Sequence, residues 1–162
     1  MAYLLDSNVF IQAKNLHYGF DFCPGFWTWL VNANAAMRAF SVDKVGTELQ
    51  AGNDDLSVWA NARGPQFFLP PDNPVLPALN QVSAWTNAQR YEPVAVATFF
   101  QVADYWLVAH ALAHQHTVVT HEVPSAGARK VKIPNVCVGL GIPCITPFEM
   151  LRLEQVRLVL AP

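Results

Sequence analysis

A carboxylate stands at the end of the first apolar run of this chain. Tyr3, Leu4 and Leu5 are typical of a short buried strand, and Asp6 follows them directly. A buried strand seldom ends in a charge unless another group compensates it, because an unpaired charge is costly to remove from water. Asp6 is therefore the first residue that we expect to do chemistry.

Three further acidic residues occupy comparable places. Glu48 lies in a short helical segment after the apolar strand AFSV, Asp104 opens the helical pattern ADYWLVAHALAH, and Glu122 closes the segment TVVTHE. Two carboxylates about 4 Å apart repel by ~4 kcal/mol at an effective dielectric constant near 20. A cluster of such groups either raises the pKa values of its members or binds a cation. Oxygen donors without His or Cys favour Mg²⁺ or Mn²⁺, ions that support phosphodiester hydrolysis.

Two other patterns suggest different chemistry. His110 and His114 are four residues apart on one predicted helix, which is a metal-ligand spacing. The glutamate and the third ligand of a zinc protease are missing there, so we favour the acidic set. The stretch DSN also resembles the Asp-x-Asp of haloacid dehalogenase phosphatases, but Asn8 replaces the second Asp.

The elements that must position the four acids follow from the apolar pattern. We expect strands at 2–6, 39–42, 66–69, 117–120 and 143–146, and helices near 8–15, 24–37, 43–51, 54–63, 74–90, 93–100, 102–115 and 147–154. This alternation predicts one α/β domain over residues 1–162, a three-layer sandwich with a mainly parallel central sheet. In such a sheet, functional residues collect beyond the carboxyl ends of the strands.

The composition limits the setting of this domain. Charged residues make up only 14% of the chain and apolar residues 52%, which favours a large buried fraction or an apolar face for a partner. A net charge of −2 excludes a broadly basic surface but not a local basic patch. We see no signal peptide and no apolar run of about 18 residues, so we expect a soluble, cytoplasmic protein.

Taken in order, these segments resemble the PIN domain, a fold of small metal-dependent ribonucleases. YLLDSNVFI is similar to its opening strand, VGTEL to its central acidic helix, VADYWLVAHALAHQHTVVTHE to its late helix and strand, and IPCITPFEML to its final strand and helix. The likeness covers essentially the whole chain. One departure is Glu122, at a position where the family usually carries Asp.

The resemblance implies an Mg²⁺-dependent endoribonuclease, a phosphodiester hydrolase, and the toxin half of a toxin–antitoxin pair. Asp6 and Asp104 would be the principal metal ligands. Glu48 would bind the ion directly or through water, and Glu122 would orient a metal-bound water. A second interpretation stays open, in which the chain is a catalytically inactive PIN-like module that binds RNA or protein.

Other residues are expected to support this site. Ser7 is expected to hydrogen-bond an acidic neighbour, and Asn8 to cap the following helix. A basic loop soon after the last acid is predicted to contact RNA phosphates through Arg129, Lys130 and Lys132.

The aromatic segment YGFDFCPGFWTWL, residues 18–30, bears on assembly. Its aromatic side chains cannot all face one narrow core stripe of a helix. Core packing is one explanation, and a surface for a second copy or an antitoxin is the other. We predict a homodimer or a tight complex with a small antitoxin protein that buries part of this segment.

Overall fold

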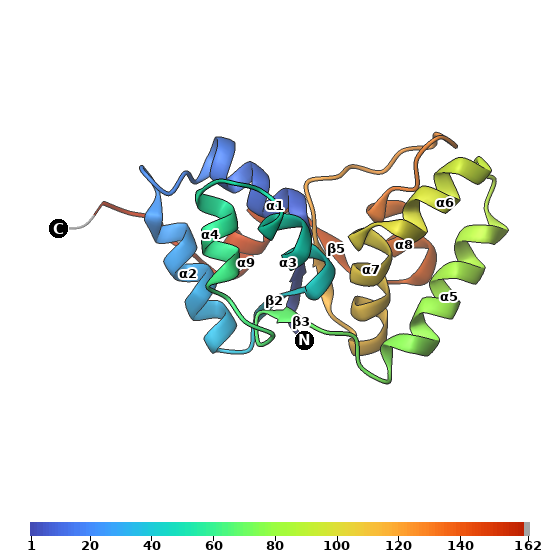
Figure 1. Cartoon of the computed structure of the whole chain (residues 1–162), viewed down its shortest axis with the longest axis horizontal. Helices are drawn as coiled ribbons and strands as arrows, with labels where there is room; N and C mark the ends of the chain where they lie inside the picture. The colour runs from blue at the N-terminus through green and yellow to red at the C-terminus, as the bar shows by residue number, and fades with distance from the viewer. Residues whose placement is uncertain (161–162) are drawn as a thin grey trace.

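A parallel sheet forms the centre of the protein in the computed structural model, which describes residues 1–160 (Figure 1). Its strand order is β3-β2-β1-β4-β5, and every neighbouring pair is parallel. The α/β sandwich predicted from the alternation of elements is confirmed, and each strand falls inside its expected range: β1 (Tyr3–Leu5), β2 (Ala39–Val42), β3 (Phe68–Leu69), β4 (Thr117–Val119) and β5 (Cys144–Ile145).

Helices cover both faces of this sheet, so the domain has three layers. In Figure 1, α2, α4 and α9 lie on one side of the strands, and α5 to α8 on the other. The described helices are α1 (Ser7–Gln12), η1 (Ala13–His17, a π-helix), α2 (Pro24–Ala35), α3 (Asp43–Gln50), α4 (Asp55–Asn61), α5 (Val75–Ala88), α6 (Pro93–Gln101), α7 (Ala103–His114), α8 (Ile133–Leu140) and α9 (Pro147–Leu153). Only α8 was not expected from the sequence.

The register of the central strands decides what emerges at the carboxyl edge of the sheet. Leu5 of β1 pairs with Val119 of β4, so the next residues, Asp6 and Thr120, leave the sheet side by side. The backbone N–H of Asp6 donates to the carbonyl of Val119 at 2.9 Å. Leu4 and Leu5 are fully buried, because helices cover both faces of this central strand.

The aromatic segment packs largely inside the chain. Phe26 and Trp27 are buried, Tyr18 stacks on Phe26 with ring centroids 4.5 Å apart, and Phe20 stacks on Trp27 at 4.1 Å. Phe22, by contrast, is 66% exposed. Core packing thus accounts for most of this segment, and the predicted homodimer or antitoxin complex receives little support from it and stays a prediction.

Buried apolar side chains from Ala2 to Leu151 form one continuous core. Within residues 1–160, no single helix is long and apolar enough to cross a membrane. The pair α6 and α7 reaches that length and composition together, but the two helices are bent by 72° at the break between them.

Candidate functional site

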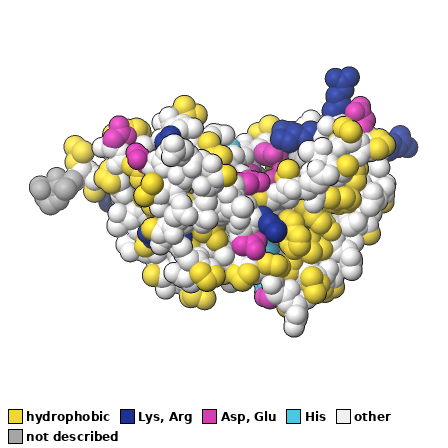
Figure 2. Space-filling model, viewed as in Figure 1, with side chains coloured by type: hydrophobic (Ala, Val, Ile, Leu, Met, Phe, Trp, Pro, Cys, Tyr) yellow, Lys and Arg dark blue, Asp and Glu magenta, His cyan; other side chains and the backbone are white. Residues whose placement is uncertain are grey.

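The four predicted acids lie beyond the carboxyl ends of the central strands. Asp6 follows β1, Glu48 belongs to the helix after β2, Asp104 lies in the first turn of α7, and Glu122 comes shortly after β4. Figure 2 shows acidic side chains gathered in the hollow between the two helical layers. Burial, together with the charges of the other three acids, raises the pKa of Asp104 to about 7. The four carboxylates therefore share one electrostatic environment.

Asp6 is the most buried of the four, with 3% of its surface exposed. Its Oδ1 accepts a hydrogen bond from the backbone N–H of Ser7 at 2.7 Å, and its Oδ2 accepts one from Thr120 Oγ1 at 2.8 Å. Among residues 1–160, no Lys, Arg or His forms an ion pair with it. Burial therefore raises the pKa of Asp6 to about 6, although the hydrogen bonds from Thr120 and Ser7 oppose the rise.

Thr120 is a functional residue that the sequence analysis did not single out. Its buried hydroxyl donates to Asp6 and accepts from Asn8 Nδ2 and from the backbone N–H of Glu122, both at 3.1 Å. One side chain thus joins the end of β1, the start of α1 and the segment after β4. The signal in the sequence that could have identified Thr120 is its position at the end of a predicted strand, two residues before Glu122.

The two supporting residues have different outcomes. Ser7 bonds to Asp6 as expected, through its backbone N–H and, at 3.4 Å, through its hydroxyl. The expectation that Asn8 caps the helix is wrong, because Asp6 occupies the cap position of α1 and accepts from Ser7. The side chain of Asn8 instead reaches β4, where its Oδ1 accepts from the backbone N–H of His121 at 3.1 Å.

Glu48 and Glu122 both accept hydrogen bonds at the amino ends of helices, where the helix dipole favours a negative charge. Glu48 Oε1 lies 3.4 Å from the backbone N of Ala103, which starts α7 and precedes Asp104. Glu122 Oε2 accepts from the backbone N–H of Ile133 at 2.9 Å, at the start of α8. Its Oε1 lies 3.4 Å from Lys130 Nζ. Both glutamates therefore also fix the helices that surround the site.

The oxygen donors of this cluster fit a hard divalent cation. Within the described chain, no three His, Cys, Asp or Glu side chains converge closely enough to hold an ion together. Mg²⁺, however, commonly takes only one or two carboxylates directly and keeps several waters. Asp6, buried and without a basic partner in residues 1–160, and Asp104, whose pKa the charge of Asp6 helps to raise, could supply those two ligands. Glu48 and Glu122 would then be reached through water.

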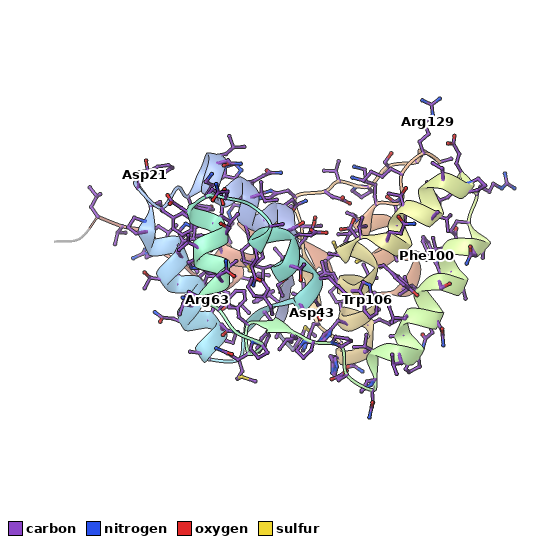
Figure 3. The ribbon with its side chains drawn as sticks, in the orientation of Figure 1. Asp21, Asp43, Arg63, Phe100, Trp106 and Arg129 are labelled. Carbon is purple, nitrogen blue, oxygen red and sulfur yellow. The ribbon has the colours of Figure 1, made fainter. Side chains whose placement is uncertain are left out.

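The basic loop borders the cluster through two of its three cations. A pocket of about 260 Å³ opens beside Asp104, and Arg129 and Lys130 belong to its lining. The side chain of Arg129 is 92% exposed, and Figure 3 shows it extending from the loop away from the fold. Lys132 instead occupies the cap position of α8 and does not line this pocket.

The predicted histidine pair lies elsewhere. His110 and His114 line a separate pocket of about 420 Å³ together with His116 and Asp72. His114 Nε2 lies 2.9 Å from Asp72 Oδ2, and His116 Nδ1 accepts from the backbone N–H of Ala2. Ala2 precedes β1, so this pocket lies at the amino edge of the sheet, away from Asp6. Burial lowers the pKa of His110 to about 4.

The comparison with protein families matches residues 3–158 to the family described as "Domain of unknown function (DUF4411)". The chain belongs to this family. No curated protein and no solved structure matches the chain. All four acids and Thr120 lie inside the segment matched to DUF4411. Because the family description names no activity, a functional hypothesis must start from the chemistry of the site.

Proposed function

We propose that this protein is an Mg²⁺-dependent endoribonuclease of the PIN type that hydrolyses RNA phosphodiester bonds. The observation that carries the proposal is Asp6, a buried carboxylate without a basic partner in residues 1–160, which shares its environment with three other acids. The sequence segments that resemble the PIN domain support it independently. The position of the cluster beyond the carboxyl ends of parallel strands agrees with where such folds carry function.

In this proposal, Asp6 and Asp104 hold the metal ion. Thr120 and the backbone of Ser7 fix the carboxylate of Asp6, so its oxygens keep one orientation. Glu48 anchors the start of α7 and thereby the position of Asp104. When bound, the ion supplies a nucleophile from water and stabilises the charge that develops on the phosphate.

The basic loop would bind the RNA backbone. The chain carries a net charge of −2, and its acidic cluster repels phosphate, so RNA needs a local positive surface to reach the site. Lys130 and Arg129 line the pocket beside Asp104 and supply that charge. Since Lys130 Nζ lies 3.4 Å from Glu122 Oε1, a phosphate would compete with this carboxylate for the ammonium group.

The toxin role and a complex with an antitoxin or a second copy are part of the proposal and rest on the resemblance. Their test is co-expression with the product of a small neighbouring open reading frame. An antitoxin should co-purify at a fixed ratio and suppress RNA cleavage. A mass in light scattering that matches one chain, with or without that product, would contradict both kinds of assembly.

A second candidate is a PIN-like module that binds RNA without cutting it. The contacts of Glu122 favour this alternative, because both carboxylate oxygens already have partners in the chain. RNA binding that is unaffected by Mg²⁺, without any cleavage, would identify such a module.

Cleavage of a mixed RNA pool tests the two candidates. We expect internal cuts with Mg²⁺ or Mn²⁺ and none with EDTA. Asp104→Asn should abolish the cuts. Asp21→Asn is a matched control, because Asp21 is exposed at the far end of the molecule (Figure 3), and it should cut normally. Equal cleavage by Asp104→Asn, or cleavage that persists in EDTA, would contradict the metal-dependent proposal.

A further inference from the structure

The pocket beside Asp104 lies in the elbow between two helices. α6 and α7 meet at 72° with Val102 at the corner, and the basic loop lines the opposite side. Its floor is apolar and buried, formed by Ala95 and Phe99 of α6 and by Val131 of the loop. The exposed rim includes the apolar Val94 as well as the polar Thr98, Arg129 and Lys130.

The walls of this pocket are held in place by the chain itself. The backbone N–H of Glu92, next to the start of α6, donates to the carbonyl of Ala128 at 2.9 Å and ties the loop to that helix. Lys130 ties the loop to the acidic cluster through Glu122. Val131 is only 2% exposed. The pocket is thus preformed, as ligand sites usually are.

The size and lining of the pocket restrict its ligand. The pocket volume of about 260 Å³ lies just below the range of roughly 300–1,000 Å³ that holds drug-sized ligands. The pocket therefore accommodates one flat ring system better than two separate ones. The buried apolar floor suits the faces of such a ring. The two cations at the rim suit a phosphate attached to it.

We propose that this pocket takes one nucleobase of the RNA, next to the phosphodiester bond that is cut, and so makes cleavage depend on base identity at one position. The inference rests on the proposed function, because it places the base next to the phosphodiester bond that this site would cut. An apolar side chain of a protein partner is a different occupant, and the experiment below distinguishes it.

Two matched variants test the proposal. Thr98→Phe places a large ring at the rim of the pocket on an exposed position of α6. Thr28→Phe is the control, on an exposed position of α2 in the other helical layer. Both hydroxyls donate only within their own helix, Thr98 to Val94 O at 2.8 Å and Thr28 to Pro24 O at 3.3 Å. The two changes therefore remove equivalent contacts.

The first readout is calorimetric binding of the four nucleoside monophosphates, compared with ribose 5-phosphate, which lacks the base. We expect at least one nucleotide to bind about 5- to 150-fold more tightly than ribose 5-phosphate, the range typical of base stacking on protein side chains. Thr98→Phe should remove this difference, and Thr28→Phe should keep it. Equal binding of all five compounds by the wild type, or an unchanged preference in Thr98→Phe, would overturn the proposal.

The second readout is cleavage of an RNA oligonucleotide in which a single abasic site is moved along the chain. We expect one position, next to the cut, at which loss of the base slows cleavage. Uniform cleavage of every oligonucleotide overturns the base pocket and leaves the nuclease intact. In another outcome, the wild type binds nucleotides in a base-dependent way that Thr98→Phe removes, and yet cleaves no RNA. That result would support the base pocket and contradict the proposed nuclease activity. If the occupant is a protein side chain, neither readout depends on the base, which overturns the proposal.

Discussion

Replacing Asp6 by Asn should stabilise the metal-free protein at alkaline pH and not at acid pH. Asn has nearly the same shape, can keep the hydrogen bond from the backbone of Ser7, and carries no charge. Burial raises the pKa of Asp6 from 3.8 to about 6 in the folded protein. Ionisation of Asp6 therefore lowers the free energy of unfolding, because the pKa of this carboxyl group is lower in the unfolded chain than in the folded protein. The wild type should lose this part of its stability as the pH rises from about 4 through 6.

The size of the effect follows from the same pKa difference. One pKa unit corresponds to 1.36 kcal/mol, so the rise from 3.8 to about 6 corresponds to ~3 kcal/mol above pH 7. The NH₂ group of Asn cannot accept the hydrogen bond that the Thr120 hydroxyl donates to Asp6 Oδ2, and the loss of this bond takes back about 1 kcal/mol. A net gain of about 2 kcal/mol at pH 8 is expected, which raises the Tm by roughly 4–8 °C in a domain of this length.

The assay is thermal unfolding of both proteins in EDTA at pH 4 and pH 8. His110, whose pKa burial lowers to about 4, titrates in both proteins and cancels in the difference between them. The variant should melt later than the wild type at pH 8 and slightly earlier at pH 4, where Asp6 is protonated in the folded wild type and the lost hydrogen bond from Thr120 is the main difference. A variant that melts earlier at pH 8 would refute the reasoning, because Asp6 would then be a structural carboxylate that the fold needs in its charged form.

Three further predictions follow from contacts around the site. Thr120→Val should destabilise the protein by about 2–4 kcal/mol in urea unfolding, because it leaves buried partners of the hydroxyl unpaired. Thr120→Ser should restore most of the lost stability. A Thr120→Val variant as stable as the wild type would contradict the role of the hydroxyl. Lys130→Ala should weaken RNA binding and lower the magnitude of the slope of the logarithm of the RNA binding constant against the logarithm of the salt concentration by roughly 0.7, the value for one phosphate contact on a single strand. The Mg²⁺ affinity measured by calorimetry should stay unchanged. An unchanged slope would mean that Lys130 does not contact phosphate. Glu122→Gln should reduce cleavage less than Asp104→Asn does, because the amide can still accept from Ile133, and equal losses of kcat would show that its charge matters as much.

Much of the fold could be predicted because its strands are short apolar runs buried on both faces. Such runs stand out in the sequence, and all five predicted strands are present. The helix α8 was missed because IPNVCVGLG is apolar on most sides and carries no acidic or hydroxyl cap in its own sequence. The side chain that binds its first N–H is Glu122, 11 residues earlier, so the start of α8 depends on the tertiary structure.

The site could be predicted only in part, for a related reason. Asp6 follows a parallel strand, and Asp104 opens the helix that leads back to the start of the next parallel strand, so both were expected at the carboxyl edge of the sheet. Thr120 lies 114 residues from Asp6, and its role appears only once β4 is paired with β1. Asn8 was misassigned because Asp6 occupies the cap position itself. The elbow pocket depends on the 72° bend between α6 and α7, which local sequence patterns do not encode.

The most direct test of the central claim is single-turnover cleavage of one RNA by the wild type and by Asp6→Asn, each with Mg²⁺ and with EDTA. The wild type should cut with Mg²⁺ and stop in EDTA. Asp6→Asn should be slower by about three orders of magnitude or more with Mg²⁺, because a weakly held ion loses several kcal/mol of transition-state stabilisation. Cleavage by Asp6→Asn at the wild-type rate would contradict the account, since the buried carboxylate at the end of β1 would then have no part in the chemistry.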